Sequence, residues 1–217
     1  MKKLFLALVA LMAALTAQAQ LLNFEGMPPY RLGVFGGLNV PSFSAGSYDY
    51  TLGVHGGLDF MISGGAFDED LSDLYTRIDL KYSMKGADGP NTVPNSAGTY
   101  DKVHFTTHYL EIPVHVGYAW RLADQFSLLA ETGPYFAYGM GGTARPDGDA
   151  IDFKEQAFFK NYDAKHFDFG WGVRAGILFS QVIELYAGYD WGFKNITPLF
   201  RQNTNFSAGL VLYFDYK

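Results

Sequence analysis

Strict alternation of apolar and polar residues is the feature that most constrains this chain. A period of two is typical of a β-strand with two different faces, whereas an amphipathic helix repeats every three or four residues. In one segment, for example, Leu110 and Ile112 flank Glu111. Eight segments show this pattern, at residues 30–40, 50–62, 73–85, 105–120, 125–140, 166–179, 182–194 and 204–216. The sequence therefore predicts an all-β fold with eight strands.

The apolar face of these strands carries the bulky side chains. In the segment 166–179, Phe169 and Trp171 share one face, and Gly170 and Gly172 lie on the other. An eight-stranded barrel is only just wide enough inside for side chains to fill, so bulky residues at every inward position would not fit. A lipocalin-like soluble barrel would also need a dense charged coat, which the polar face lacks. We therefore predict an eight-stranded antiparallel up-and-down transmembrane β-barrel, apolar outside and polar inside.

Charged residues of both signs fall on the polar face of the strands. They are Arg77, Asp79, Lys81, Glu111, Glu131, Arg174, Glu184 and Asp190. Charges taken out of water need partners, so we interpret this set as a structural network that fills the lumen. Buried ionisable groups also mark ion pathways, and a narrow passive pore is the alternative interpretation.

Aromatic residues are abundant, with 15 Tyr and 19 Phe, and several stand near predicted strand ends. Membrane barrels carry aromatic girdles where the wall meets the two membrane surfaces. We expect the following residues to form these girdles: Trp120, Phe126, Tyr138, Phe167, Trp191, Phe193 and Tyr216.

The first residues, "MKKLFLALVALMAALTAQAQ", have the three parts of a secretory signal peptide: a cationic start, an apolar stretch and a small-x-small cleavage site. We expect residues 1–19 to be removed and residues 20–217 to form one barrel domain in the outer membrane. The connections at 121–124 and 180–181 are short, whereas those at 86–104 and 141–165 are long. Whether the long loops bind a ligand is open at this stage.

The stretch "HYLEIPVH" at residues 108–115 has the composition of a metal site. On a strand, however, His108 and Glu111 point to opposite faces because they are an odd number of residues apart. Glu111 and His115 share a face but lie about 13 Å apart along the strand, too far for one metal ion. Pro113 would break a helix, so we expect no metal here. Because proline cannot donate to the ladder, we expect a bulge or a missing hydrogen bond at Pro113.

Three histidines, His104, His108 and His166, lie near the predicted outer rim of the barrel. A hydrolase or acyltransferase would need a nucleophile and an orienting group beside such a base, and no G-x-S-x-G elbow accompanies them. We therefore expect a non-enzymatic protein without a cofactor. An outer-membrane lipid-modifying enzyme with a rim histidine is the second alternative.

The order of several segments resembles PorT-like outer-membrane β-barrel proteins of Bacteroidetes-type bacteria. The resemblance covers essentially the whole mature chain and rests on "RLGVFGGLNV", "LYTRIDLKYSMKG", "HYLEIPVHVGYAW", "LLAETGPYFAYGMGG", "FDFGWGVRAGILF" and "ELYAGYDWGFKNI". It implies a structural or secretion-accessory role and supplies no catalytic residues. Such barrels commonly end on an aromatic residue, whereas here Lys217 follows Tyr216.

The expected partners follow from this location and from the charge. They are outer-membrane lipids, the barrel-insertion machinery during biogenesis, and secretion-system or periplasmic proteins. We expect Phe214 and Tyr216 to be the residues that the insertion machinery recognises. The net charge of −6 and the lack of a Lys/Arg cluster argue against nucleic acid as a partner.

Overall fold

The computed structural model describes residues 29–44, 48–94, 100–146, 156–197 and 201–214. Within these ranges the chain forms eight long strands: β1 (Tyr30–Phe43), β2 (Gly53–Ser63), β3 (Leu74–Pro94), β4 (Tyr100–Ala123), β5 (Phe126–Pro146), β7 (Phe167–Phe179), β8 (Ile183–Gly192) and β9 (Asn203–Phe214). The smaller elements are the 3-10 turns η1 (Gly64–Ala66) and η2 (Glu69–Leu71), the two-residue strand β6 (Gln156–Ala157) and the helix α2 (Phe158–Asn161). The expected signal peptide at 1–19 and Tyr216 lie outside the described residues.

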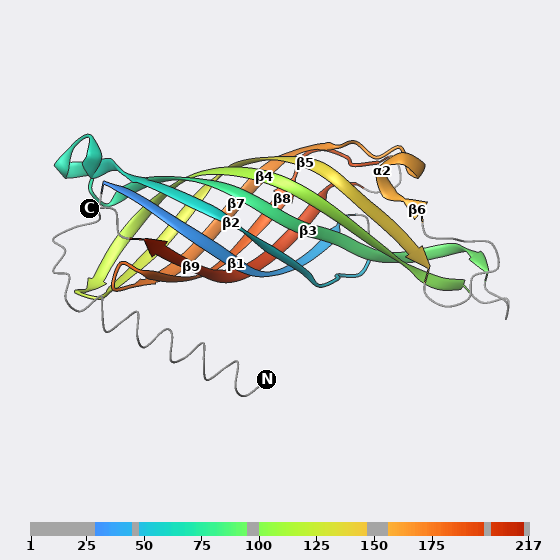
Figure 1. Ribbon diagram of the computed structural model, residues 1–217, viewed down its shortest axis with the longest axis horizontal. Helices are drawn as coiled ribbons and strands as arrows, with labels where there is room; N and C mark the ends of the chain where they lie inside the picture. The colour runs from blue at the N-terminus through green and yellow to red at the C-terminus, as the bar shows by residue number, and fades with distance from the viewer. Residues whose placement is uncertain (1–28, 45–47, 95–99, 147–155, 198–200, 215–217) are drawn as a thin grey trace, which may run out of the picture.

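The eight long strands close into a ring (Figure 1). Each pairs antiparallel with its neighbours in the order β4-β3-β2-β1-β9-β8-β7-β5, and β4 pairs with β5 to complete the circle. β1 meets β9 in a register that places Leu32 opposite Phe214. Closure leaves no free edge in the wall, which is the condition for a sheet to cross a membrane. The fold is the predicted eight-stranded up-and-down barrel.

The two ends of the barrel differ. Three connections lie at the end where β1 begins and β9 ends, here called the turn end. They are the connection that contains η1 and η2, residues 124–125, and residues 180–182. α2, β6 and the extended β3–β4 hairpin lie at the opposite end, here called the loop end (Figure 1). In the part of the chain that the structure describes, no helix is long and apolar enough to span a membrane.

The prediction of a loop was wrong for most of 86–104 and for 141–146, which are strand. The region 86–104 was expected to be a loop, but β3 continues to Pro94 and β4 begins at Tyr100. The region 141–165 likewise contains the end of β5, then β6 and α2. The glycines and prolines in these regions suggested turns. Backbone pairing, such as that of Asp88 with His104, needs no alternation of apolar and polar residues, so the strands continue beyond the apolar wall.

The direction of the side chains matches the predicted alternation. On β4, Leu110 and Ile112 are 41% and 43% exposed on the outer face, whereas Glu111 between them is 1% exposed. The same alternation recurs on β7, where Val173 and Ile177 are exposed and Leu178 is buried. An apolar outer face with charged groups inside is the arrangement of a barrel surrounded by lipid.

The stretch around Pro113 is regular strand. Its register does not change at Pro113, so the expected bulge is absent there; the shift in the β4–β5 ladder falls between His108 and Tyr109 instead. The pairing of β4 with β3 is interrupted between Glu111 and Val114, which agrees with the alternative expectation of a missing hydrogen bond at Pro113. His108 lies outside, stacked on Tyr82.

Candidate functional site

The lumen of the barrel is filled by three layers of side chains. The order of the layers can be followed along β3. From the turn end to the loop end, apolar Tyr75 comes first, charged residues follow, and apolar Ala87 comes last. The charged residues between them are Arg77, Asp79, Lys81 and Lys85, all buried. The candidate site is therefore a charged layer enclosed between two apolar layers.

The apolar layer at the turn end closes the charged layer on one side. Met61, Leu129 and Val211 in this layer are at most 1% exposed, which requires tight packing across the barrel. The buried members of this layer are Phe35, Met61, Tyr75, Ala119, Leu129, Leu178, Tyr186, Val211 and Tyr213.

Arg77 is the centre of the first set of ion pairs. Its guanidinium contacts Glu184 at 3.2 Å and 2.9 Å, Glu131 at 3.1 Å and Asp59 at 3.4 Å. Tyr213 donates its hydroxyl to Glu184 at 2.6 Å and also receives a hydrogen bond from Arg77 at 3.0 Å. The planar guanidinium suits this task because it presents five donors in a fixed fork.

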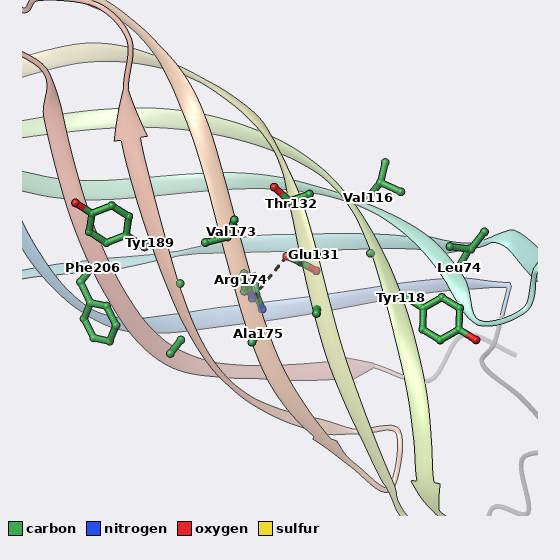
Figure 2. Close-up of a pocket in the computed structure, with 14 residues that line it drawn as sticks. Leu74, Val116, Tyr118, Glu131, Thr132, Val173, Arg174, Ala175, Tyr189 and Phe206 are labelled. Carbon is green, nitrogen blue, oxygen red and sulfur yellow. Dashed lines mark ion pairs between the residues drawn. The ribbon is translucent and has the colours of Figure 1, made fainter.

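Arg174 is the second cation of this set. It contacts Glu184 at 2.9 Å, Asp79 at 3.5 Å and Glu131 at 3.8 Å, and its guanidinium lies 3.7 Å from the ring centre of Tyr186. Figure 2 shows the pair of Arg174 and Glu131 inside the wall, bridging β7 and β5. The Arg77–Arg174 set therefore joins strands from all sides of the lumen.

A second set of ion pairs lies nearer the loop end. Lys81 contacts Glu111 at 3.0 Å and Asp190 at 3.5 Å, and Lys85 contacts the other oxygen of Glu111. The eight charged residues predicted for the lumen all lie there, but among the described residues their ion pairs form two sets. Glu131 and Arg174 belong to the first set, whereas Glu111 and Asp190 belong to the second.

A cavity of about 30 Å³ separates the two sets. Asp79 and Arg174 line it from the first set, and Lys81 and Asp190 from the second. His115 also lines the cavity and uses Nδ1 to contact Glu131 at 3.2 Å, whereas its Nε2 has no partner among the described residues. The space is large enough for ordered water and much too small for a solute path.

The loop-end layer is a cluster of aromatic rings, and α2 supplies its centre. Phe158 of α2 is fully buried and stacks on Phe43 with ring centres 6.3 Å apart. Phe159 packs edge-to-face on Tyr109. The buried members are Phe43, Ala87, Val103, Phe105, Tyr109, Tyr135, Ala137, Ala144, Phe158, Phe159, Ala164 and Ile196. Phe158 and Phe159, which lie in the region 141–165 that was expected to be a loop, therefore point inward and cover the charged layer.

Two tyrosines complete this layer above the wall. Tyr48 and Tyr162 are partly buried against the cluster. Burial raises the pKa of both phenols above the ordinary value, and the neighbouring Tyr162 adds to the effect on the pKa of Tyr48. The raised pKa values agree with an apolar surrounding, which disfavours the charged phenolate.

Several polar residues of the lumen were not predicted from the sequence. Asp59 and Lys85 are ion-paired there, and His55 joins Asn39 at 2.8 Å and the hydroxyl of Tyr186. The alternation of β2 and β3 places Asp59 and Lys85 on the polar face, so the period-of-two pattern could have identified both.

The six predicted girdle residues that the structure describes lie on the outer face, and Tyr138 lies within β5 rather than at its end. Trp120 and Phe126 are 45% and 40% exposed at the turn end, and Tyr138, Phe167 and Phe193 are exposed at the loop end. Trp191 is half-buried and lies 6.1 Å from the ring of Tyr189. The positions are those that interfacial anchors require, and the anchoring role itself stays a prediction.

A shallow depression lies on the outer wall between β4 and β9 and is shown in Figure 2. Ala130, Ala175 and Ala187 are register partners on β5, β7 and β8, and their small side chains leave the floor of the depression low. Val116 and Phe206 stand at its rim. The floor and rim are apolar, so the depression suits the acyl chains that surround a membrane-spanning wall.

The rim histidines do not converge. His104 Nδ1 contacts Asp88 at 2.6 Å, His108 Nδ1 contacts the Tyr82 hydroxyl at 2.7 Å, and His166 Nδ1 contacts the Gly139 carbonyl at 2.6 Å. Each lies in its own place on the wall. Among the described residues, no group of three or more His, Cys, Asp or Glu side chains could hold a metal ion.

A closed antiparallel ring with an apolar outer wall and a charged, filled interior defines a membrane-spanning β-barrel. The sequence agrees at the level of the family: residues 18–198 match the family described as "Outer membrane protein beta-barrel domain". The chain belongs to this family and is an outer-membrane protein. No curated protein matches the sequence significantly.

Solved structures with some similarity include three bacterial surface proteins. Neisserial surface protein A (NspA) is 14% identical with a TM-score of 0.46, and 88% of this chain and 100% of that chain are covered. OprG of Pseudomonas aeruginosa is 8% identical with a TM-score of 0.47, covering 88% and 99%. Ail of Yersinia pestis is 12% identical with a TM-score of 0.41, covering 86% and 100%. These values carry no function over to this chain.

Proposed function

We propose that the protein is a non-conducting, non-enzymatic barrel that serves as a structural or secretion-accessory component of the outer membrane. The observation that supports this most is the filling of the lumen. Ion pairs such as Arg77–Glu184 cross it, and apolar layers cover these pairs at both ends. A pore needs a continuous polar path, and here Phe158 at one end and Leu129 at the other are buried within apolar layers.

The secretion-accessory part rests on the resemblance to PorT-like proteins and on the shape of the loop end. β3 and β4 continue as a paired hairpin beyond the level where β2 begins at Gly53 (Figure 1). β5 pairs with β4 only as far as Val103, so the end of this hairpin beyond that pair offers backbone groups to another protein. A barrel that transports nothing itself acts through such contacts.

A deletion strain tests this role. Proteins released to the medium and displayed on the cell surface are compared in the deletion strain with and without the wild-type gene. The proposal expects a loss of specific exported proteins that the wild-type gene restores. The matched control is Val116→Arg, a wall variant expected to insert poorly and therefore to restore nothing. An unchanged set of exported proteins would contradict the accessory role.

The same strain distinguishes the accessory role from the alternative of a lipid-modifying enzyme. The contact of His104 with Asp88 favours that alternative, because a carboxylate orients a histidine base in this way. Altered outer-membrane lipids in the deletion strain would support that alternative if the wild-type gene restored them and His104→Ala did not. The proposal expects unchanged lipids.

A further inference from the structure

The charges of the Arg77–Arg174 set do not balance. Its two guanidiniums contact four carboxylates, those of Asp59, Asp79, Glu131 and Glu184. Arg31 is linked to the set through Tyr213, since its guanidinium lies 4.1 Å from that ring. Four carboxylates therefore face three guanidiniums between the two apolar layers, and His115, 3.2 Å from Glu131, adds a fourth positive charge only when it is protonated. A buried excess charge is costly, so one further positive charge is required.

Two of these carboxylates face each other directly. Asp59 on β2 and Asp79 on β3 are register partners, and both side chains point into the lumen. Opposite residues of an antiparallel pair have Cβ atoms about 4.5–5.5 Å apart. Both residues are buried, at 0% and 5% exposed. Two carboxylates on opposite residues repel each other, which favours a proton on one of them.

The two arginines lie closer to Glu184 than to either aspartate of this pair. Arg77 and Arg174 each approach Glu184 to 2.9 Å, but they stay 3.4 Å from Asp59 and 3.5 Å from Asp79. Within the described residues, neither oxygen of Asp59 has a hydrogen-bond partner, and Oδ1 of Asp79 has none. A pair of buried carboxylates in which three oxygens accept no hydrogen bond from the described residues can accept a proton.

The other titratable groups around the pair are engaged elsewhere. Arg31 of β1 donates to the carbonyl of Gln181, His115 of β4 contacts Glu131, and Tyr213 of β9 donates to Glu184. Their described contacts place no donor on Asp59 or Asp79.

We propose that Asp59 and Asp79 bind one proton between them, so that one is a carboxylic acid donating to the carboxylate of the other. The proton comes from water when the barrel folds and makes the charges equal, with three carboxylates against three guanidiniums. The aspartate pair is thus a binding site whose ligand is a proton. The other candidate occupant, a monovalent metal cation, is an outcome that the test distinguishes.

Infrared spectroscopy of the folded barrel in lipid vesicles tests the proposal at neutral pH. The wild type should show the carbonyl stretch of a protonated carboxylic acid, shifted on exchange into D₂O. Asp59→Asn and Asp79→Asn should each lose this band, because one remaining carboxylate needs no proton. The matched control Asp190→Asn, from the Lys81 set, should keep it. Absence of the band in the wild type, or its survival in both pair variants, would overturn the proposal.

Stability supplies a readout that does not depend on the band. The folded barrel holds a proton that the unfolded chain does not hold at neutral pH. The free energy of unfolding of the wild type should therefore fall as the pH rises through the range in which the folded barrel loses this proton. Asp79→Asn should remove that part of the pH dependence. Equal alkaline sensitivity in both proteins would contradict the proposal. A different result would assign a metal cation to the aspartate pair and would also overturn the proposal: no acid band in the infrared spectrum, and a barrel that is stable in sodium salt but not in choline salt.

Discussion

Arg77 and Glu184 form a two-point ion pair across the lumen, although three other strands separate β3 from β8 along the wall. The two N–O distances are 3.2 Å and 2.9 Å, and both side chains are 1% exposed. Parallel contacts of this kind fix orientation as well as charge. The lumen of this barrel is therefore tied together across its diameter.

Replacing Arg77 by methionine should strongly destabilise the barrel. Arg77→Met leaves Glu184, Glu131 and Asp59 without their shared cation, and breaking a buried ion pair from one side costs about 3–5 kcal/mol. Urea unfolding in lipid vesicles, followed by tryptophan fluorescence, measures the change in the free energy of unfolding.

The matched control is an ion pair at the loop end. Lys102 and Asp49 are 58% and 67% exposed, so Lys102→Met should change the free energy of unfolding by less than about 1 kcal/mol. If Arg77→Met changed it no more than this control does, the structural interpretation of the lumen charges would be wrong.

Arg174 should be irreplaceable even by lysine. Arg174→Leu removes the contacts with Glu184 and Asp79 and should lower the unfolding temperature. Arg174→Lys keeps the charge but loses the planar group that lies over Tyr186, so it should restore only part of the stability. The temperature at which the folded band disappears on a denaturing gel reports both effects. Full recovery with lysine would show that charge alone matters.

The sequence predicted the wall better than the contents of the lumen. Alternation assigned Leu110 to lipid and Glu111 to the interior because strand geometry alone determines the face. It could not show which cation meets which carboxylate, since Arg77 and Glu184 are distant both in sequence and around the wall. Nor could it show that Phe158 turns inward, because that segment has no alternation. Such contacts depend on the radius and tilt of the closed barrel, which local patterns do not encode.

An arginine on the outer wall should be costly at mid-height. Val116 is 57% exposed on β4, between Leu110 near the loop end and Trp120 near the turn end. Val116→Arg should therefore reduce the free energy of unfolding by about 2–4 kcal/mol in a bilayer, the cost of a charged side chain near the midplane. Tyr50→Arg, at an exposed position before β2, should stay within about 0.5 kcal/mol. Equal costs at the two positions would mean that lipid does not contact this face.

The aromatic layer at the loop end should stabilise the barrel without being its only seal. Phe158→Ala removes a fully buried ring and should cost about 3–5 kcal/mol. It should not open a conducting path, because the ion pairs and the layer around Leu129 remain below it. Planar-bilayer recordings of wild type and variant should both stay at the level of the bare membrane. Steady single-channel steps in Phe158→Ala alone would make α2 a gate.

Thiol labelling tests the sealed lumen most directly, because the chain contains no cysteine and a single introduced thiol reports alone. Ser207 is 6% exposed and lines the lumen cavity, whereas Tyr50 is 68% exposed outside the wall. In the folded barrel, Ser207→Cys should resist a water-soluble thiol reagent that labels Tyr50→Cys rapidly, and heat unfolding should make both react. Labelling of Ser207→Cys in the folded barrel at the rate of Tyr50→Cys would show that water-soluble molecules enter the lumen and would contradict the sealed barrel.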